Sequence, residues 1–342
     1  METYKGKPVF EASNRKELED AVAHCIEKIE PPYVVKIPAG SKQVGIHAFA
    51  DDSTIGVVIL PDSVKLIGNG AFFGCKKLMD VNIPESVLEI GEWAFSFCDL
   101  RSIHIPKSVE KICSGVFNGC QYHREIDVDP ANPVYDSREN CNAVIETATG
   151  RLLFGSRNSI IPSSVVEISD HAFSRCEYLW EITIPSSVER IGNKAFNYCK
   201  GLNGIKIPDS VKEIGSYAFN NCSSIKRIRI PDSVKTIGEG AFYNCKNLKD
   251  IYISDPSLLQ NAVNDPSVTI ISGFKHTPKT KTALITAIRE EIKRQGSHAD
   301  LNCIDTSAIK NMRELFNKFK TFNGDISEWN VSNVTDMADM FN

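Results

Sequence analysis

Apolar residues recur along this chain with a period of 23 residues, much longer than the period of a single helix or strand. The unit that starts at Pro208 reads P-D-S-V-K-E-I-G-S-Y-A-F-N-N-C-S-S-I-K-R-I-R-I. The same frame starts at Pro38, Pro61, Pro84, Pro106, Pro162, Pro185, Pro208 and Pro231. A repeat of this length predicts a solenoid, because each unit can bury its apolar side only against its neighbours. Solenoids are more typical of binding surfaces than of catalytic pockets.

Each unit contains two short extended stretches, S-V-x-x-I-G and L-x-x-I-x-I, and between them an A-F-x-x-C segment that predicts one tight helical turn. The phenylalanines fall in phase and are expected to be core, so truncating one should cost about 3–5 kcal/mol. They are Phe49, Phe72, Phe95, Phe117, Phe173, Phe196, Phe219 and Phe242. The recurring glycine of S-V-x-x-I-G is expected to supply either a positive φ or room for packing, and Cys113 and Ser169 replace it in two units.

Seven cysteines also share one position of the repeat and predict a buried column of free thiols. They are Cys75, Cys98, Cys120, Cys176, Cys199, Cys222 and Cys245. Stacked coils hold such side chains parallel and about 4.8 Å apart, whereas a disulfide needs Cβ atoms about 3.8 Å apart with a specific torsion. No metal site is predicted, because the chain has neither a C-x-x-C motif nor a nearby His pair.

The flanking segments define the remaining domains. Residues 1–36 are predicted to be an N-terminal cap, with a capping box at Asn14 and Glu17, a helix up to about Ile29, and then a strand. The solenoid covers residues 37–254. One gap between repeats is 33 residues longer than a period and predicts a hairpin insert over 129–160 that projects from the solenoid without breaking it.

The C-terminal part follows a different pattern. Residues 255–280 are predicted to be a cap or linker, and 281–342 a helix plus the start of a second repeat region. The helix is expected over Lys281–Gln295, with Gly296 ending it. Residues 304–316 match residues 329–341 at an offset of 25 residues.

Composition and motifs exclude several function classes. The net charge of −4 and the pI near 6.0 argue against general nucleic-acid binding. No apolar run long enough for a membrane span occurs. Catalytic and cofactor-binding motifs are absent, so no enzyme activity and no cofactor are predicted. His123 and Cys141 are the one imaginable thiol–base pair, but nothing in the sequence orients them.

Outward positions of the L-x-x-I-x-I strands predict a two-column ladder of exposed side chains. The candidate partner-binding residues on it are Glu125, Asp127, Glu181, Lys206, Arg227, Arg229, Asp250 and Tyr252. Like charges stacked about 4.8 Å apart repel. An uncompensated cluster of Lys206, Arg227 and Arg229 is therefore a hypothetical epitope for an acidic partner, and a merely solvated face is the alternative.

The repeats resemble two known families. The I-P-x-S-V-x-x-I-G-x-x-A-F-x-x-C-x-x-L-x-x-I unit over 37–254 resembles the BspA-like leucine-rich repeats of bacterial surface proteins, as does the D-P-x-N-P-x-Y motif of the insert. The W-N-V-S-N-V-T-D-M-x-x-M-F unit over about 301–342 resembles a second bacterial surface-protein repeat of unknown function. The resemblance implies an α/β repeat solenoid, a right-handed curved leucine-rich-repeat array with mostly short strands, tight helical turns and the β-hairpin insertion.

The resemblance also implies a non-enzymatic adhesion protein of a bacterial cell surface, or a secreted one, that binds host matrix proteins such as fibronectin or fibrinogen, or glycans. The alternative is an intracellular scaffold or regulatory protein–protein interaction module. Residues 1–8 lack the apolar run of a secretory signal, and free thiols favour a reducing compartment. The sequence predicts neither the binding face nor the oligomeric state.

Overall fold

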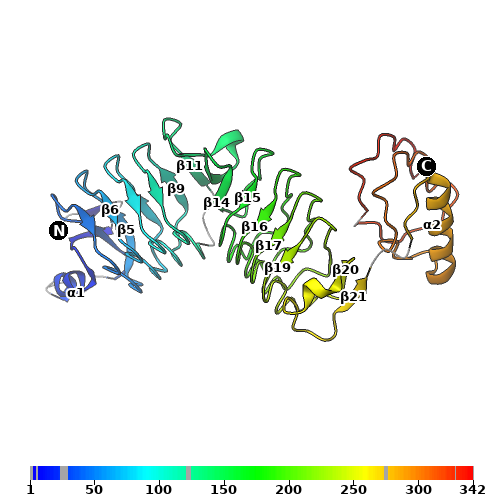
Figure 1. The fold of residues 1–342 in the computed structure, drawn as a ribbon. Coiled ribbons are helices and arrows are strands. Elements are labelled where there is room, and N and C mark those ends of the chain that lie inside the picture. Colours follow the sequence, from blue (N-terminus) through cyan, green and yellow to red (C-terminus); the bar gives the residue numbers. More distant parts are fainter. Residues whose placement is uncertain are drawn as a thin grey trace. The chain divides into compact units, whose positions relative to one another are not determined.

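The computed structural model describes residues 3–4, 7–23, 30–120, 125–272, 276–327 and 329–341 (Figure 1). The chain divides into two compact units. The first consists of Met1–Ile225, Ser233–Asn247 and Leu258–Pro266, and the second of Lys226–Asp232, Leu248–Ser257 and Ser267–Asn342. No helix of the described residues has both the length and the apolar character needed to cross a bilayer.

The first unit begins with a small cap on the repeats. Its elements are β1 (Thr3–Tyr4), β2 (Lys7–Glu11), α1 (Arg15–Ala23) and β3 (Tyr33–Lys36), with β3 pairing in parallel with β5 (Ile55–Ile59) of the first repeat. The capping box predicted for α1 is confirmed, since the Asn14 Oδ1 accepts from the Glu17 N–H at 3.1 Å. Residues 24–29 of the predicted helix lie outside the described residues.

The S-V-x-x-I-G segments form short strands that pair in parallel from coil to coil. Before the insert these are β4 (Gln43–Val44), β6 (Leu66–Ile67), β8 (Glu89–Ile90) and β10 (Lys111–Ile112). After it they are β15 (Glu167–Ile168), β16 (Arg190–Ile191), β17 (Glu213–Ile214) and β19 (Thr236–Ile237). Each strand contributes one fully buried isoleucine or valine to the core, apart from the half-buried Ile112 and Ile237.

The L-x-x-I-x-I segments form strands in only some of the repeats. In the first unit these are β5, β7 (Asp80–Asn82), β9 (Ser102–Ile105) and β11 (Glu125–Val128), and in the second they are β18 (Arg227–Arg229) and β20 (Asp250–Ile253). The prediction of a strand is wrong for residues 180–184 and 203–207. One backbone hydrogen bond, from the Asn203 N–H to the Trp180 carbonyl, joins these two described segments, which is too few for strand pairing.

The phenylalanine column is the core of the repeats, as predicted. Neighbouring rings stack with centroids 5.2–5.6 Å apart and planes within 7° of each other. At the insert, Phe154 continues the column and packs against Phe117 with centroids 4.6 Å apart. The core cluster that begins in the N-terminal cap therefore extends as far as Phe154 of the insert.

The A-F-x-x-C segment is a pair of tight turns and not the predicted helical turn. In the unit around Phe219, Tyr217 and Asn221 have φ values of 56° and 60°, in the left-handed region. These two residues reverse the direction of successive peptide groups. The Phe219 N–H consequently donates to the Ala241 carbonyl of the following coil at 2.8 Å, while the N–H groups of intervening residues close turns within their own coil.

The recurring glycine serves close packing, which settles the alternative left open by the sequence. Gly68 does not have a positive φ, and a Cβ there would lie 2.8 Å from the Val44 carbonyl oxygen of the preceding coil. Its own N–H donates to that same carbonyl at 2.9 Å. A side chain at this position would thus push two coils apart.

The insert contains the predicted hairpin, made of β13 (Ala143–Glu146) and β14 (Arg151–Gly155), with β12 (Tyr135–Asp136) and the 3-10 helix η1 (Arg138–Asn140) before it. The expectation that it leaves the solenoid unbroken is wrong. β14 pairs in parallel with β15 and takes the place of a repeat strand, so the short-strand ladder ends at β10 and restarts at the insert.

The second unit contains β18, β20, β21 (Thr269–Ser272) and α2 (Lys281–Gln295), and the 3-10 helix η2 (Pro256–Leu259) follows β20. Helix α2 has the predicted bounds, and Gly296 ends it at φ 85°. The 25-residue repeat is confirmed by parallel bridges between Asp300 and Asp325 and between Asn311 and Asp336. Phe316 stacks on its repeat equivalent Phe341 with centroids 5.2 Å apart.

Candidate functional site

The predicted ladder of outward side chains lies on two separate units. In the first, Glu125, Asp127, Glu181 and Lys206 are all exposed, and the Asp127 carboxylate accepts a 2.8 Å contact from the His104 ring. Burial still alternates along residues 181–184 although they are not a strand, so the outward direction predicted for Glu181 is correct.

In the second unit, carboxylates of the same unit neutralise the basic side chain of Arg227. The Arg227 guanidinium pairs with Asp250 at 3.2 Å, with Asp300 at 3.5 Å, and also with Asp325. Tyr252 is buried and its hydroxyl donates to Asp300 at 2.9 Å, and burial together with that carboxylate raises the pKa of the phenol. The predicted uncompensated cluster is therefore wrong for Arg227, because Asp250 occupies the same ladder column one repeat later. Arg229 is half-buried and pairs in register with Tyr252.

Sequence reasoning missed exposed apolar side chains at the end of the insert and in the repeat that follows it. The exposed fractions are 68% for Ile160, 62% for Trp180 and 42% for Tyr178. Ile160 stands two residues before Pro162 and thus holds an outward ladder position. The repeat register contained this signal, since Ile160 occupies the position that Thr183 and Lys206 hold in the next repeats.

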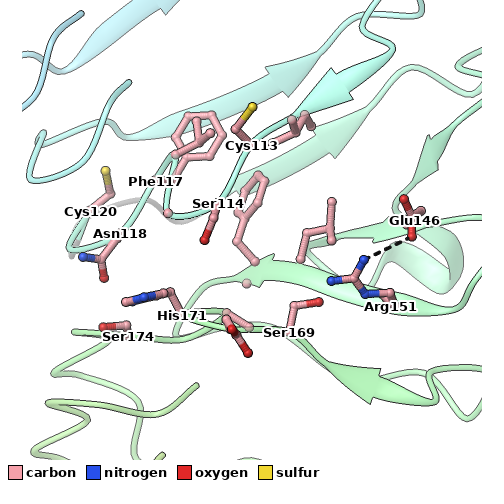
Figure 2. A pocket seen from close by; sticks show the side chains of 18 of the residues that line it. Cys113, Ser114, Phe117, Asn118, Cys120, Glu146, Arg151, Ser169, His171 and Ser174 are labelled. Atoms are coloured by element: carbon pink, nitrogen blue, oxygen red, sulfur yellow. Dashed lines mark ion pairs between the residues drawn. The ribbon is translucent and has the colours of Figure 1, made fainter. Parts of the chain in front are cut away.

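A second candidate site is a pocket of about 390 Å³ between the coil of residues 112–120 and the coil of residues 169–176 (Figure 2). We call it the inter-coil pocket. Phe117, Cys120 and Phe154 line its apolar side, and Asn118, His171 and Ser174 lie on opposite walls. The pocket exists because the insert supplies the strand β14 and the ring of Phe154 at this point, but no A-F-x-x-C turn.

Four side-chain polar atoms in this pocket have no hydrogen-bond partner although they are buried. These atoms are the Asn118 Oδ1, the Ser169 Oγ, the His171 Nδ1 and the Ser174 Oγ. Ser169 and Ser174 are each only 4% exposed. Buried polar groups in folded proteins are nearly always paired with protein, water or ligand, so their concentration here marks the pocket as polar and suited to water or a hydrogen-bonding ligand.

The backbone of the wall formed by residues 112–120 is equally unusual. In regular coils, alternate N–H groups donate to the following coil, as Phe173 does to Ala195 at 2.7 Å. The equivalent N–H groups of Gly115, Phe117 and Gly119 have no such partner among the described residues. Gly115 and Phe117 line the inter-coil pocket, so their N–H groups form a short row of donors along one wall.

Two side-chain contacts join the coil of residues 169–176 to the coil that precedes residues 112–120. The Trp93 ring reaches the His171 ring edge-on, with centroids 4.9 Å apart, and the Arg175 guanidinium lies 4.9 Å from the Phe97 ring centroid. The intervening coil has glycine at both crossing points, and Gly115 is the clearer case, because a Cβ there would lie 2.5 Å from the Trp93 ring. The bridges hold the two coils on either side of the pocket in place.

Charged groups at one end of the pocket neutralise one another. Arg151 lies 3.8 Å from Glu146 and 3.3 Å from Glu167, and Arg190 lies 3.2 Å from Asp170. Burial by itself would raise the pKa of Asp170, but hydrogen bonds from Asn193 and the charge of Arg190 outweigh it and lower that pKa. Burial and the charge of Lys194 lower the pKa of His171, which favours the neutral imidazole. The pocket thus presents polar groups with little net positive charge.

The imagined thiol–base pair finds no geometry here, because His123 lies outside the described residues. Cys141 is buried, and its Sγ lies 3.7 Å from the Ser137 Oγ and 3.6 Å from the Ala143 carbonyl oxygen. Burial raises the pKa of this thiol.

The fold and its repeat chemistry define a leucine-rich-repeat solenoid. Residues 36–142 and 156–264, more than half of the chain, match the family model of the BspA type leucine rich repeat region. The chain belongs to this family. Residues 286–342 match a second family model, described as a Mycoplasma protein of unknown function. A search of curated protein sequences finds no significant match.

Solved structures of bacterial leucine-rich-repeat proteins share the fold. A leucine rich cell surface protein from Faecalibacterium prausnitzii is 23% identical with a TM-score of 0.53, covering 78% of this chain and 82% of its own. A leucine-rich repeat protein from Eubacterium ventriosum is 19% identical with a TM-score of 0.58, covering 98% and 88%. The pneumococcal vaccine antigen PcpA is 18% identical with a TM-score of 0.54, covering 70% and 78%.

Proposed function

We propose that this protein is a non-enzymatic adhesion protein of a bacterial cell surface. It binds a host or matrix protein, or a glycan carried by one, through the outward face of its L-x-x-I-x-I segments. Membership of the BspA type family supports a binding scaffold. The observation that carries the proposal is the exposure of Ile160 at the end of the insert and of Trp180 and Tyr178 in the next repeat.

These side chains have the character of an interface centre. Tryptophan and tyrosine dominate the binding energy of protein interfaces, and large exposed apolar groups in a stable monomer mark contact sites. The acidic residues Glu181, Asp127 and Glu125 share the outward face of the same unit. The partner that fits is therefore a protein with an apolar centre and a basic rim.

Binding to immobilised fibronectin and fibrinogen, measured by surface plasmon resonance, tests the proposed face. Trp180→Ala and Ile160→Ser should each weaken binding about tenfold or more. Ile46→Ser is the matched control, because Ile46 is 69% exposed but lies in a turn and not on the ladder. Equal losses in all three variants, or no loss in the first two, would remove this face from the proposal.

Two further measurements separate the remaining alternatives. Glu125→Lys with Glu181→Lys should weaken binding if the acidic side contributes, whereas Lys206→Glu with Arg229→Glu should do so if a basic epitope is used. Proteolysis of intact bacteria should remove the repeats from the cell surface. Full protection without lysis would instead support the intracellular scaffold.

A further inference from the structure

The inter-coil pocket is a binding site separate from the exposed ladder face. We propose that it binds a neutral, polyhydroxylated molecule of monosaccharide size, either a free sugar or the terminal residue of a glycan.

The inter-coil pocket requires polar occupants. The hydroxyls of Ser169 and Ser174 are more than nine-tenths buried and unpaired, and the Asn118 Oδ1 faces the same space without a partner. Leaving such groups unsatisfied is costly, and the repeat equivalents of Asn118 avoid it, because the Asn220 amide donates to the Asn197 Oδ1 at 2.9 Å. A ligand that hydrogen-bonds to these atoms would recover that cost.

Hydrogen-bond donors and acceptors are arranged on opposite walls of the pocket. One wall offers the N–H groups of Gly115 and Phe117, and the opposite wall offers the two serine hydroxyls and the neutral His171 ring. A ligand that spans the pocket must accept on one side and both donate and accept on the other. Hydroxyl groups do both, so a ring that carries several of them satisfies both walls at once.

Neither an anion nor a cation suits the inter-coil pocket. The arginines at the end of the pocket are already paired with Glu146, Glu167 and Asp170, so an anion finds no free positive side chain there. A cation is disfavoured because the row of backbone N–H groups points into the pocket. The rings of Phe117 and Phe154 offer an apolar surface on which the less polar face of a sugar ring can rest.

The size of the pocket and its access to solvent fit a monosaccharide. The volume of about 390 Å³ lies within the range of small-molecule sites and exceeds what a few ordered waters need. Of the turn residues that line the pocket, Ser114 is exposed, and Asn118 and His171 are half-buried, so the pocket communicates with solvent on the side of the turns. A sugar at the end of a glycan chain can therefore enter from that side.

The test titrates the full chain with D-glucose, D-galactose, D-mannose and N-acetyl-D-glucosamine and with their α- and β-methyl glycosides. Calorimetry and the amide resonances of Gly115 and Phe117 are the two readouts. At least one sugar should bind saturably with a Kd on the order of 1 mM. Binding of methyl glycosides identifies the terminal residue of a glycan, and binding of the reducing sugar alone identifies a free sugar.

The matched variants locate the effect. Ser169→Ala with Ser174→Ala removes two unpaired hydroxyls, which leaves folding intact and should weaken the sugar about tenfold or more. Ser108→Ala with Ser233→Ala is the control, because both of those hydroxyls are also buried and unpaired but lie outside the pocket.

Several outcomes would overturn the proposal. They are no binding of any sugar at about 50 mM, saturable binding of inorganic phosphate at Gly115 and Phe117 instead of sugar, and equal weakening by both double variants. Crystals soaked in these sugars that show only ordered water in the pocket would overturn it as well.

Discussion

The thiol of Cys199 donates a hydrogen bond to the backbone carbonyl of Phe173 in the preceding coil, with Sγ and O 3.1 Å apart. The same contact, at 3.0–3.1 Å, recurs at Cys75, Cys98, Cys120, Cys222 and Cys245. Cys176 is different, because the insert precedes it and its thiol meets the Gly155 carbonyl at 3.8 Å. The cysteine column therefore joins the coils through hydrogen bonds, without disulfides.

These buried thiols should be chemically inert. Burial raises the pKa of Cys120 and Cys176 to about 12. We expect a thiol reagent at pH 8 to leave the column unmodified in the native protein and to label the half-buried Cys113 and Cys303 first. Mass mapping of the labelled peptides is the measurement. Since inert thiols survive in either redox environment, the column does not support the argument for a reducing compartment.

The same pKa values predict an alkaline loss of stability. An unfolded thiol ionises near its ordinary pKa of 9.0, whereas the folded thiol of Cys120 stays protonated up to about pH 12. The unfolded state is therefore favoured progressively as the pH rises from about 9 to about 12. Urea unfolding between pH 7.5 and pH 11 should show a falling free energy of unfolding. A Cys120→Ala variant should show a shallower decline than the native chain, and an unchanged slope would contradict the assignment.

Tyr135 should anchor the insert through its hydroxyl. The phenol oxygen accepts from the Ile112 N–H at 2.9 Å, at the point where the ladder of β10 ends. Tyr135→Phe leaves this N–H unpaired and should lower the free energy of unfolding by about 1–3 kcal/mol. Amide hydrogen exchange at Ile112 should accelerate, while exchange at Ile67, which lies inside the same ladder, serves as the control. Unchanged protection at Ile112 would show that the hydroxyl does not cap the strand.

The left-handed turn positions should respond to glycine in a predictable direction. Lys194 has φ 54°, so Lys194→Gly should raise the free energy of unfolding by about 1 kcal/mol. Gly74 has φ +74°, and a Cβ there would lie 2.2 Å from the Asp51 Oδ1, so Gly74→Ala should lower it by about 1–2 kcal/mol. Urea midpoints of both variants provide the check. A stabilising Gly74→Ala would contradict the strain.

The regular repeats were predictable from sequence because their determinants are local and periodic. Phe196 and Cys199 recur in phase, and their burial follows from that alone. The turn conformation was missed, since φ at Tyr217 is set by hydrogen bonds to the next coil and not by residue preference. The pairing of Arg227 with Asp250 was readable in the ladder, but its contact with Asp300 depends on tertiary packing.

The inter-coil pocket was beyond sequence reasoning for a different reason. It results from a mismatch: the insert replaces a strand and a core ring but not the turn between them. Ser169 and Ser174 belong to an otherwise ordinary repeat, and only the missing turn before them leaves their hydroxyls unpaired. Detecting such a site requires knowing which coil β14 replaces, and that follows from its pairing with β15.

The stacked rings should make the cost of a core truncation depend on position in the column. Phe196 lies between Phe173 and Phe219, at 5.2 and 5.3 Å, whereas Phe242 stacks only on Phe219 among the described rings. Both are at most 2% exposed, so the apolar surface that each loses on truncation is similar. Phe196→Ala should cost near the upper end of about 3–5 kcal/mol and Phe242→Ala near the lower end, because an aromatic pair adds about 0.5–1.5 kcal/mol beyond area. Urea unfolding of the two variants measures the difference. Equal losses would mean that ring stacking adds nothing to burial in this column.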